Sequence, residues 1–192
     1  MTGIILAGGK NSRISMSKAH IKMGKHTVIE KTAKLFCDIF DEVIVITNKP
    51  DDYMNLGVKL ASDIIPGKGP LGGIYSGLKL SSNHYNFIVA CDMPFIEPSI
   101  IQYLQRYSKN DLFDVIVPEY NGFIEPLFAI YSRNCIEPIV KNLKDNQLKI
   151  RCFFTQVRIK EVSYNRFNAV EKSFFNINTK EDLHKAKRLD FG

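Results

Sequence analysis

Three short apolar runs constrain the fold of this 192-residue chain more than any other feature. They occupy residues 3–7, 43–46 and 86–91 and contain few polar side chains. Each run is too short for a typical helix, and none alternates between apolar and polar residues as a half-exposed strand does. The run at 43–46 is Val-Ile-Val-Ile, entirely β-branched, which is typical of a strand buried on both faces. The runs therefore predict the central strands of a parallel sheet.

The residues between the first two runs have the period of an amphipathic helix over 27–40. Thr27 and Glu30 match the pattern of a capping box at its start. A strand, a helix and a second strand in this order predict a βαβ unit. The same reasoning predicts helices over 70–81, 98–107, 134–143, 148–157 and 180–189, and strands over 58–61, 114–118, 126–131 and 158–162.

A glycine turn follows the first predicted strand, and basic residues follow the turn. Gly8-Gly9 leads to Lys10, Arg13 and Lys18, and the first 25 residues hold five basic side chains and no acidic one. Main-chain N–H groups and cations in this arrangement suit the oxygens of a nucleoside triphosphate. The sequence lacks both the dinucleotide fingerprint G-x-G-x-x-G and the P-loop pattern G-x-x-x-x-G-K-[ST]. An ordinary turn with a solvated basic face remains the alternative.

Two later loops carry candidate ligand groups. Residues 63–73, DIIPGKGPLGG, are too rich in Gly and Pro for regular structure throughout and lead into a helix. Asp92 follows the apolar run at 86–91, so its carboxylate would lie at the edge of the sheet where ligands bind. One or two carboxylates with phosphate oxygens commonly hold Mg²⁺. The competing interpretations are glycines that serve only loop geometry and an aspartate that only begins a turn.

Composition is that of a soluble globular domain, with 45% apolar and 24% charged residues. No apolar run approaches transmembrane length, and no secretory signal pattern opens the sequence. The four cysteines form no C-x-x-C pair, so we expect reduced thiols and a cytoplasmic location. A net charge of +6 is compatible with nucleic acid, a membrane surface or a phosphorylated small molecule as partner.

Four motifs in order resemble the molybdenum cofactor guanylyltransferase (MobA) family of nucleotidyltransferases. The matching segments are Leu6-Ala7-Gly8-Gly9 with Ser12-Arg13 and Lys18-Ala19, Asp63 with Gly69-Pro70-Leu71-Gly72-Gly73, Cys91-Asp92-Met93-Pro94, and Phe174 to Leu183 with Asn176, Asn178 and Thr179. Ile14-Ser15 and Ser17 depart from the family pattern, and Lys180 replaces its proline. The resemblance covers nearly the whole chain.

The resemblance implies a single α/β domain with a mostly parallel, doubly wound, Rossmann-like sheet and helices on both faces. It places nucleotide binding in residues 1–97 and acceptor binding in residues 98–192. The residues that it implies for catalysis are Lys18, Arg13 and Asp92, with Asp92 also on the metal. Those that it implies for the nucleotide are Leu6, Ala7, Gly8, Gly9, Lys18, Asp63, Gly69, Gly73 and Asp92. Those that it implies for the acceptor are Pro126, Asn176 and Asn178.

The reaction implied by the resemblance is transfer of GMP from GTP to the terminal phosphate of Mo-molybdopterin, with Mg²⁺ as cofactor. The products would be molybdopterin guanine dinucleotide and pyrophosphate. Transient contact with other proteins of molybdenum cofactor biosynthesis is implied, and neither nucleic acid nor a membrane is. Because both reactants are anions, the protein's main tasks would be to position them and to neutralise the leaving group.

Three alternatives remain open at this point. A relative could use CTP, or transfer a nucleotide to a different phosphorylated acceptor. A basic nucleic-acid-binding module would instead bind RNA with steep salt dependence and no need for Asp92. A catalytically silent relative is the third alternative, because Ser15 and Ser17 alter the first loop.

Overall fold

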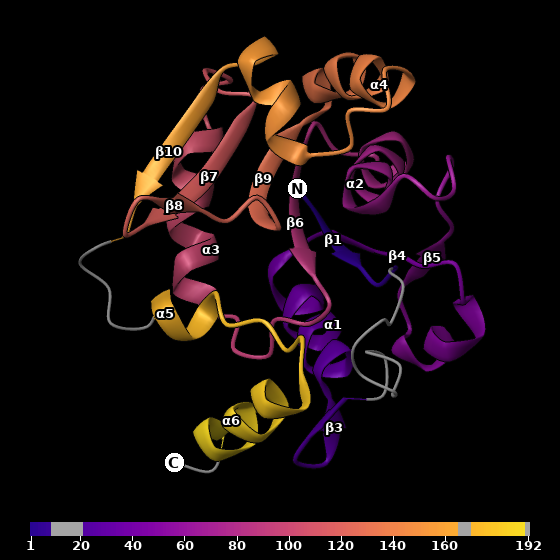
Figure 1. The fold of residues 1–192 in the computed structure, drawn as a ribbon, viewed down its shortest axis with the longest axis vertical. Helices are drawn as coiled ribbons and strands as arrows, with labels where there is room; N and C mark the ends of the chain where they lie inside the picture. Colours follow the sequence, from indigo (N-terminus) through magenta and orange to yellow (C-terminus); the bar gives the residue numbers. More distant parts are fainter. Residues whose placement is uncertain (9–20, 165–169, 191–192) are drawn as a thin grey trace.

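The computed structural model describes residues 1–8, 21–164 and 170–190, and a mixed sheet runs through the centre of this part of the chain (Figure 1). The strand order is β10-β7-β9-β6-β1-β4-β5, and β8 pairs with β7. The strands are β1 (Thr2–Leu6), β4 (Glu42–Ile46), β5 (Lys59–Ala61), β6 (Tyr85–Ala90), β7 (Val115–Tyr120), β8 (Phe123–Ile124), β9 (Phe128–Ser132) and β10 (Ile159–Ser163). A separate hairpin joins β2 (Lys22–Met23) and β3 (His26–Thr27).

The order of the strands places a topological switch point beside β1. From β1 the chain moves outward to β4 and β5, and it then returns to β6 on the other side of β1. These strands all pair in parallel, whereas β9 pairs antiparallel with both β6 and β7. Ligands in open α/β sheets bind at the carboxyl ends of strands at such a point. The mostly parallel, doubly wound sheet predicted from the sequence is therefore confirmed.

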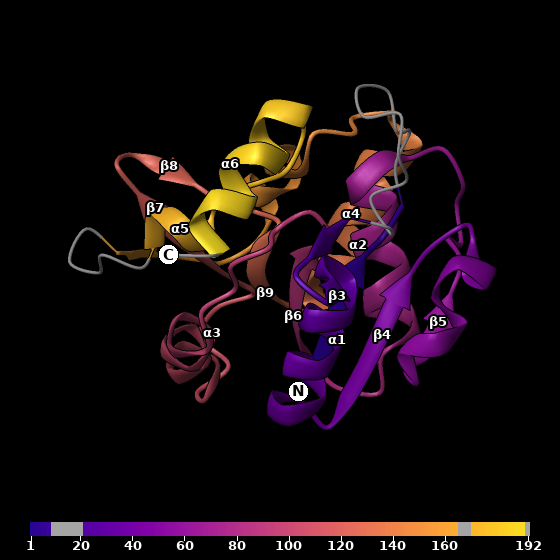
Figure 2. The ribbon, with the colours of Figure 1, turned by 90° about the horizontal axis from the view of Figure 1, so that it is seen from below.

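Helices cover both faces of the sheet (Figures 1 and 2). The α-helices are α1 (Val28–Ile39), α2 (Gly69–Leu80), α3 (Pro98–Gln105), α4 (Ile136–Lys144), α5 (Val170–Ser173) and α6 (Lys180–Asp190). The 3₁₀ helices are η2 (Pro50–Leu56), η3 (Arg106–Ser108), η4 (Arg133–Cys135) and η5 (Ile150–Gln156). No helix among the described residues is both long enough and apolar enough to cross a membrane.

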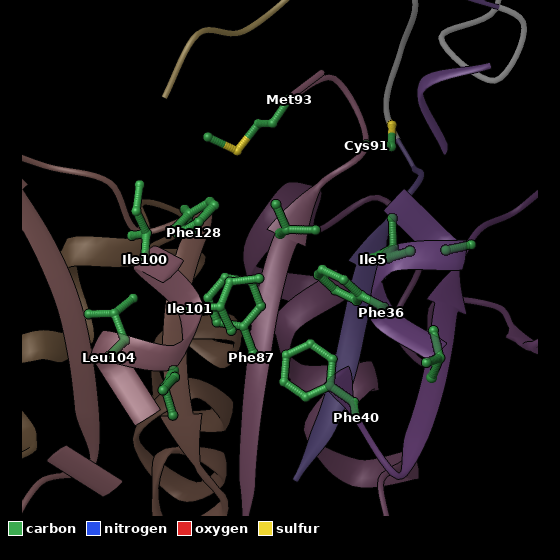
Figure 3. Packing of buried hydrophobic residues seen from close by; sticks show 14 of the residues in the cluster. Ile5, Phe36, Phe40, Phe87, Cys91, Met93, Ile100, Ile101, Leu104 and Phe128 are labelled. Carbon is green, nitrogen blue, oxygen red and sulfur yellow. The ribbon is translucent and has the colours of Figure 1, made fainter. Parts of the chain in front are cut away.

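Neighbouring residues of the central strands face opposite layers of the core. Ile5 and Phe87 belong to the apolar cluster beneath α1 and α3, whereas Ile4 and Ile88 belong to the cluster beneath α2, α4 and η5. Figure 3 shows the first cluster, with Phe36 of α1 and Phe40, the residue after this helix, beside Phe87; the ring centroids of Phe36 and Phe87 lie 5.7 Å apart. Burial on both faces explains why these strand sequences are uniformly apolar.

A third apolar cluster joins the two ends of the chain at the carboxyl edge of the sheet. Ile21, Met23 and Val28, in and beside the β2–β3 hairpin, pack with Ile177 and with Ala186 of α6. Figure 1 shows α6 beside this hairpin, below the central strands. The segment before α6 is thereby held over the same edge as the glycine turn after β1.

The sequence predicted the start of α1 correctly, whereas one predicted α-helix is a 3₁₀ helix in the structure. The Thr27 hydroxyl accepts from the Glu30 N–H and the Glu30 carboxylate accepts from the Thr27 N–H, which confirms the capping box of α1. The segment predicted as a helix over 148–157 is instead the 3₁₀ helix η5. Its apolar positions Ile150 and Phe153 are three residues apart, a spacing that equally fits a helix with three residues per turn.

Gly77→Ala tests how closely α2 packs on β1. A Cβ atom at Gly77 would lie 2.8 Å from Cδ1 and 2.9 Å from Cγ2 of Ile4. Alanine favours a helix interior by about 0.5–1 kcal/mol, but overpacking a core costs about 1–3 kcal/mol. We therefore expect a net loss of about 1 kcal/mol in the free energy of unfolding, measured with denaturant. Adding Ile4→Val removes Cδ1 and should recover part of the loss; a stabilised single variant would contradict this packing.

Glu42→Gln tests a hydrogen-bonded carboxylate at the opposite edge of the sheet. Partial burial favours a higher pKa for Glu42, but hydrogen bonds from Ser82, Thr2 and Lys59 outweigh it and lower the pKa from 4.5 to about 2. A carboxyl group whose pKa is lower in the folded state stabilises the fold at pH values above its unfolded-state pKa. That stabilisation is lost as the pH falls through the folded-state pKa. A pKa lower by about 2.5 corresponds to about 3.4 kcal/mol at 1.36 kcal/mol per pKa unit. Because solvent screens part of this interaction and the glutamine oxygen can still accept a hydrogen bond, we expect the variant to be less stable by about 2–3 kcal/mol at pH 7.

The difference between wild type and Glu42→Gln should shrink as the pH is lowered from 4.5 towards 2. Denaturant unfolding at several pH values measures it. Glu161→Gln, which changes an exposed carboxylate on β10, is the matched control. A difference that stays constant down to pH 3 would count against this role of Glu42.

Candidate functional site

The chain that leaves β1 stays tied to both neighbouring strands. The Ala7 N–H donates to the Ile46 carbonyl at 2.8 Å, and the Cys91 N–H donates to the Leu6 carbonyl at 3.1 Å. Ala7 is half-buried and Gly8 is exposed, so the main chain opens to solvent at the switch point. The other residues implied for this loop, Gly9, Arg13 and Lys18, lie outside the described residues.

Asp63 and Asn48 form a reciprocal pair beside this turn. Asn48 Nδ2 donates to Asp63 Oδ2 at 2.9 Å, and the Asp63 N–H donates to Asn48 Oδ1 at 3.2 Å. Asn48 comes after β4 and Asp63 comes after β5. One residue beyond β4, the Thr47 N–H still donates to the carbonyl of Ala61 in β5 at 2.8 Å. Strand pairing therefore places an amide and a carboxylate together at the edge.

Two glycines leave open space around the Asp63 carboxylate. A Cβ atom at Gly8 would lie 3.9 Å from Asp63 Oδ2, and a Cβ atom at Gly73 would lie 3.8 Å from Asp63 Oδ1. A Cβ atom at Gly73 would also lie 3.1 Å from Leu6 Cδ2, so the N-terminal part of α2 packs tightly against the end of β1. The structure therefore brings together Leu6, Gly8, Asp63 and Gly73, four of the residues that the sequence assigned to the nucleotide.

The loop from 63 to 69 has a defined conformation. Ser76 Oγ accepts from the Ile64 N–H at 2.9 Å and donates to the Gly72 carbonyl at 2.8 Å, which fastens the loop to α2. Gly69 has φ of +59°, a left-handed value that favours glycine, and it begins α2. Lys68 Nζ reaches across to Asn146 Oδ1 at 3.1 Å, which ties the loop to the turn after α4.

Asp92 is the second residue after β6 and is 8% exposed. Glu125, in the turn before β9, brings a second carboxylate to this edge, and its Oε1 accepts from the Leu127 N–H at 3.1 Å. Burial raises the pKa of Glu125. The hydrogen bond from the Leu127 N–H lowers this pKa, and the negative charge of Asp92 raises it. The Ala90 N–H donates to the Leu127 carbonyl at 3.1 Å, so main-chain pairing brings the turn that carries Glu125 to the end of β6.

These two carboxylates are ligands of the kind that Mg²⁺ takes in proteins. No group of three or more His, Cys, Asp or Glu side chains that could hold a metal occurs within residues 1–8, 21–164 and 170–190. Mg²⁺ takes only one or two protein carboxylates and fills its other positions with water and substrate phosphates. Asp92 and Glu125 supply such a donor set.

The residues assigned to the acceptor come from two segments that are in contact, since the ring centroids of Phe128 and Phe174 lie 5.4 Å apart. Asn176 and Asn178 flank Ile177, whose N–H donates to the Asp92 carbonyl at 2.9 Å. Phe174 packs on the α1 and α3 side of the sheet, whereas Leu127, next to Pro126, packs on the α2 and α4 side. Pro126 lines an open pocket of about 550 Å³ there, together with Pro70 and residues 148–152.

The model of the MobA-like NTP transferase domain matches residues 3–161. The chain belongs to the MobA-like NTP transferase family. A relative in this family, the probable molybdenum cofactor guanylyltransferase of Pelotomaculum thermopropionicum, is 37% identical over 97% of this chain and 91% of its own length. The molybdenum cofactor guanylyltransferase of Desulfosudis oleivorans is also 37% identical, over 97% of this chain and 94% of its own length.

A solved structure agrees with the architecture of this MobA-like domain. The molybdopterin-guanine dinucleotide biosynthesis protein A of Archaeoglobus fulgidus superposes with a TM-score of 0.85 over 98% of both chains at 23% identity. At this level of identity the likeness supports the fold alone. It agrees with the family assignment, which rests on the domain match and on the relatives.

Two residues of this MobA-like site escaped the sequence analysis. Asn48 follows a predicted strand exactly as Asp63 and Asp92 do, so the rule that strand ends meet at one edge could have identified it. Glu125 gave no such signal, because it lies before an antiparallel strand. Its position depends on the pairing of β9 with β6, which the sequence does not reveal.

Proposed function

We propose that this chain transfers GMP from GTP to the terminal phosphate of Mo-molybdopterin. A phosphate oxygen of the acceptor forms a bond to the α-phosphorus of GTP, and the bond between this phosphorus and the bridging oxygen to the β-phosphate breaks. The products are molybdopterin guanine dinucleotide and pyrophosphate. The main support is that Asp63, Gly8 and Asp92 all lie near the end of β1. The second support is that relatives of this chain over nearly its full length are named molybdenum cofactor guanylyltransferases.

The Asp63–Asn48 pair supports guanine as the base. Guanine presents two adjacent N–H donors, N1–H and the 2-amino group, which a single carboxylate can accept together. Adenine and cytosine each present a ring nitrogen acceptor beside their amino group, and a carboxylate would repel this acceptor. Asn48 would hold the carboxylate in place by donating to Asp63 Oδ2. The pair therefore supplies a chemical reason to prefer GTP over CTP.

We assign the charged part of the nucleotide to the turn after β1 and to α2. Main-chain N–H groups of Leu6, Ala7, Gly8 and Gly9 would approach the phosphates, Gly69 and Gly73 would leave room for the nucleoside, and Arg13 and Lys18 would balance negative charge. Asp92, with Glu125 as a second candidate, would hold Mg²⁺, which when bound neutralises charge on the leaving pyrophosphate. Because the attacking group is already an anion, the reaction needs no strong general base.

The remaining assignments extend the same proposal. The nucleotide would bind mainly to residues 1–97 and the acceptor mainly to residues 98–192, with Pro126, Asn176 and Asn178 as acceptor contacts. We place the reaction in the cytoplasm, where GTP is available. Contact with other proteins of molybdenum cofactor biosynthesis would deliver the acceptor or receive the product.

Calorimetric titration with GTP, CTP and ATP, with and without Mg²⁺, tests the proposal. We expect GTP to bind most tightly, and Mg²⁺ to strengthen its binding in wild type but not in Asp92→Asn. Tighter binding of CTP would preserve the fold and mechanism but change the product. If no nucleotide bound at millimolar concentration, the proposal would be wrong and a silent relative would be the better interpretation.

A further inference from the structure

Ser76 lies in α2, and its side chain is fully buried. Its hydroxyl donates to the Gly72 carbonyl at 2.8 Å, a contact that serines inside helices often make. The same oxygen also accepts from the Ile64 N–H at 2.9 Å, although Ile64 lies twelve residues earlier and outside the helix. This second bond joins α2 to the loop that carries Asp63.

The N–H of Ile64 belongs to the peptide group that follows Asp63. The peptide group that precedes Asp63 is also held by a side chain, because the Asp63 N–H donates to Asn48 Oδ1 at 3.2 Å. Since peptide groups are planar, the orientations of these two groups fix φ and ψ of Asp63. Asn48 and Ser76 together therefore fix the direction in which the Asp63 carboxylate leaves the main chain.

Packing holds the rest of the loop on α2 but not the peptide group after Asp63. Ile64 is 45% exposed, whereas Ile65 packs against the apolar cluster beneath α2. The loop lies close to the helix because residue 72 is glycine: a Cβ atom there would lie 2.9 Å from Lys68 Cβ and 3.3 Å from the Ile65 carbonyl oxygen. Removal of the Ser76 hydroxyl should therefore leave the loop on α2 and release only this peptide group.

We propose that Ser76 is a positioning residue for base recognition: its hydroxyl holds the peptide group after Asp63, so that the carboxylate faces both N–H donors of guanine. The inference rests on the proposed function and adds a residue that does not itself contact the base. Because Ser76 is fully buried, it acts through Asp63. A carboxylate turned away from this direction would keep one hydrogen bond to the base and lose the other.

Equilibrium binding of GTP and of inosine triphosphate (ITP) to Ser76→Ala tests this role. We expect the Kd for GTP to rise about 3- to 10-fold, the effect of one neutral hydrogen bond. The Kd for ITP should rise less, because inosine lacks the 2-amino group and presents one N–H donor to the carboxylate. The preference for GTP over ITP should therefore fall. Equal weakening of both nucleotides would overturn the inference, since a serine that only supports the fold would have this effect.

Two further variants separate the hydrogen bond from general effects of the substitution. Ser132 is also fully buried, and it pairs with Tyr85 at the start of β6, at the opposite edge of the sheet. Its hydroxyl donates to Asp114 Oδ1 at 3.3 Å, so Ser132→Ala is a matched control and should change neither Kd by more than about twofold. Ser76→Thr keeps the hydroxyl and should keep the preference for GTP. Loss of the preference in Ser76→Thr as well would assign it to packing and overturn the inference.

Hydrogen exchange of the Ile64 amide, followed by NMR in the nucleotide-free protein, tests the contact without any ligand. Ser76→Ala should speed this exchange by about tenfold or more, because the N–H loses the acceptor that holds it. Ser132→Ala should leave the exchange rate of Ile64 unchanged. If Ser76→Ala left that rate unchanged, the hydroxyl would not hold this peptide group, and the inference would be wrong.

Failure of this inference can be distinguished from failure of the proposed function. If wild type transfers GMP and prefers GTP over ITP, but Ser76→Ala has the same preference, Ser76 does not position the carboxylate and the function stands. If wild type binds neither nucleotide, the proposed function is wrong and the role of Ser76 in base recognition falls with it.

Discussion

Asp92→Asn is expected to lower the single-turnover rate of GMP transfer by about 10²–10³-fold, the usual effect of removing one preorganised electrostatic contact to the transition state. Asparagine has nearly the same size as aspartate, and the main-chain bond from the Ile177 N–H to the Asp92 carbonyl does not involve the side chain. The fold should therefore survive, as circular dichroism and thermal unfolding can verify. The lost property would be the negative charge that we assign to holding Mg²⁺.

The Mg²⁺ dependence separates this explanation from a general loss of activity. Wild type should show a saturable dependence of rate on Mg²⁺, and Asp92→Asn should need far more Mg²⁺ for its residual rate. Asp51→Asn makes the same change at an exposed position in η2 and should have no effect. If Asp92→Asn kept the wild-type rate and Mg²⁺ dependence, Asp92 would have no place in the reaction.

Glu125→Gln extends the same experiment to the second carboxylate. If both carboxylates serve one ion, the double variant should lose much less than the product of the two single losses, because residues that act as a unit are not additive. Independent, multiplicative losses would instead show that Glu125 acts apart from Asp92.

Asp63→Asn is expected to weaken GTP binding by roughly 10- to 100-fold, since hydrogen bonds to a charged group contribute about 1.5–3 kcal/mol. The substituted amide would direct an NH₂ group, or only one acceptor oxygen, at the two N–H donors of guanine. The Asp63 N–H can still donate to Asn48 Oδ1, so the loop itself should persist. Equilibrium binding of GTP measures the effect, again with Asp51→Asn as the control.

Inosine triphosphate, which lacks the 2-amino group of guanine, makes this test specific to the base. Wild type should bind it more weakly than GTP, whereas Asp63→Asn should bind the two with nearly equal affinity. If the variant weakened both nucleotides equally and kept the wild-type preference, Asp63 would support the loop rather than read the base.

The parts of this fold that the sequence predicted are those fixed by neighbouring residues. The capping box at Thr27 and Glu30 depends on four consecutive positions, and the buried runs of β1, β4 and β6 depend on their own composition. The end of the buried run that became β6 also predicted where Asp92 would lie, because ligand groups in α/β sheets gather at the carboxyl ends of parallel strands.

The rest depends on pairings between distant segments. The Lys68–Asn146 hydrogen bond joins residues 78 positions apart, and the approach of Glu125 to Asp92 requires the antiparallel strand β9. No local pattern contains either contact. The pocket beside Pro126 is of the same kind, since its walls come from three separate stretches of the chain. Sequence reasoning thus placed Asp92 at the carboxyl edge of the sheet but could not predict which distant segments join it there.

The bond between Ile177 and Asp92 has a consequence for the order of events during protein synthesis. Every strand of the central sheet ends at or before Ser163, so a ribosome synthesises all of them before it adds residue 177. The turn that carries Asp92 gains this main-chain partner only from the segment before α6. A message broken between codons 164 and 177 would therefore encode every sheet strand without the partner of the Asp92 carbonyl.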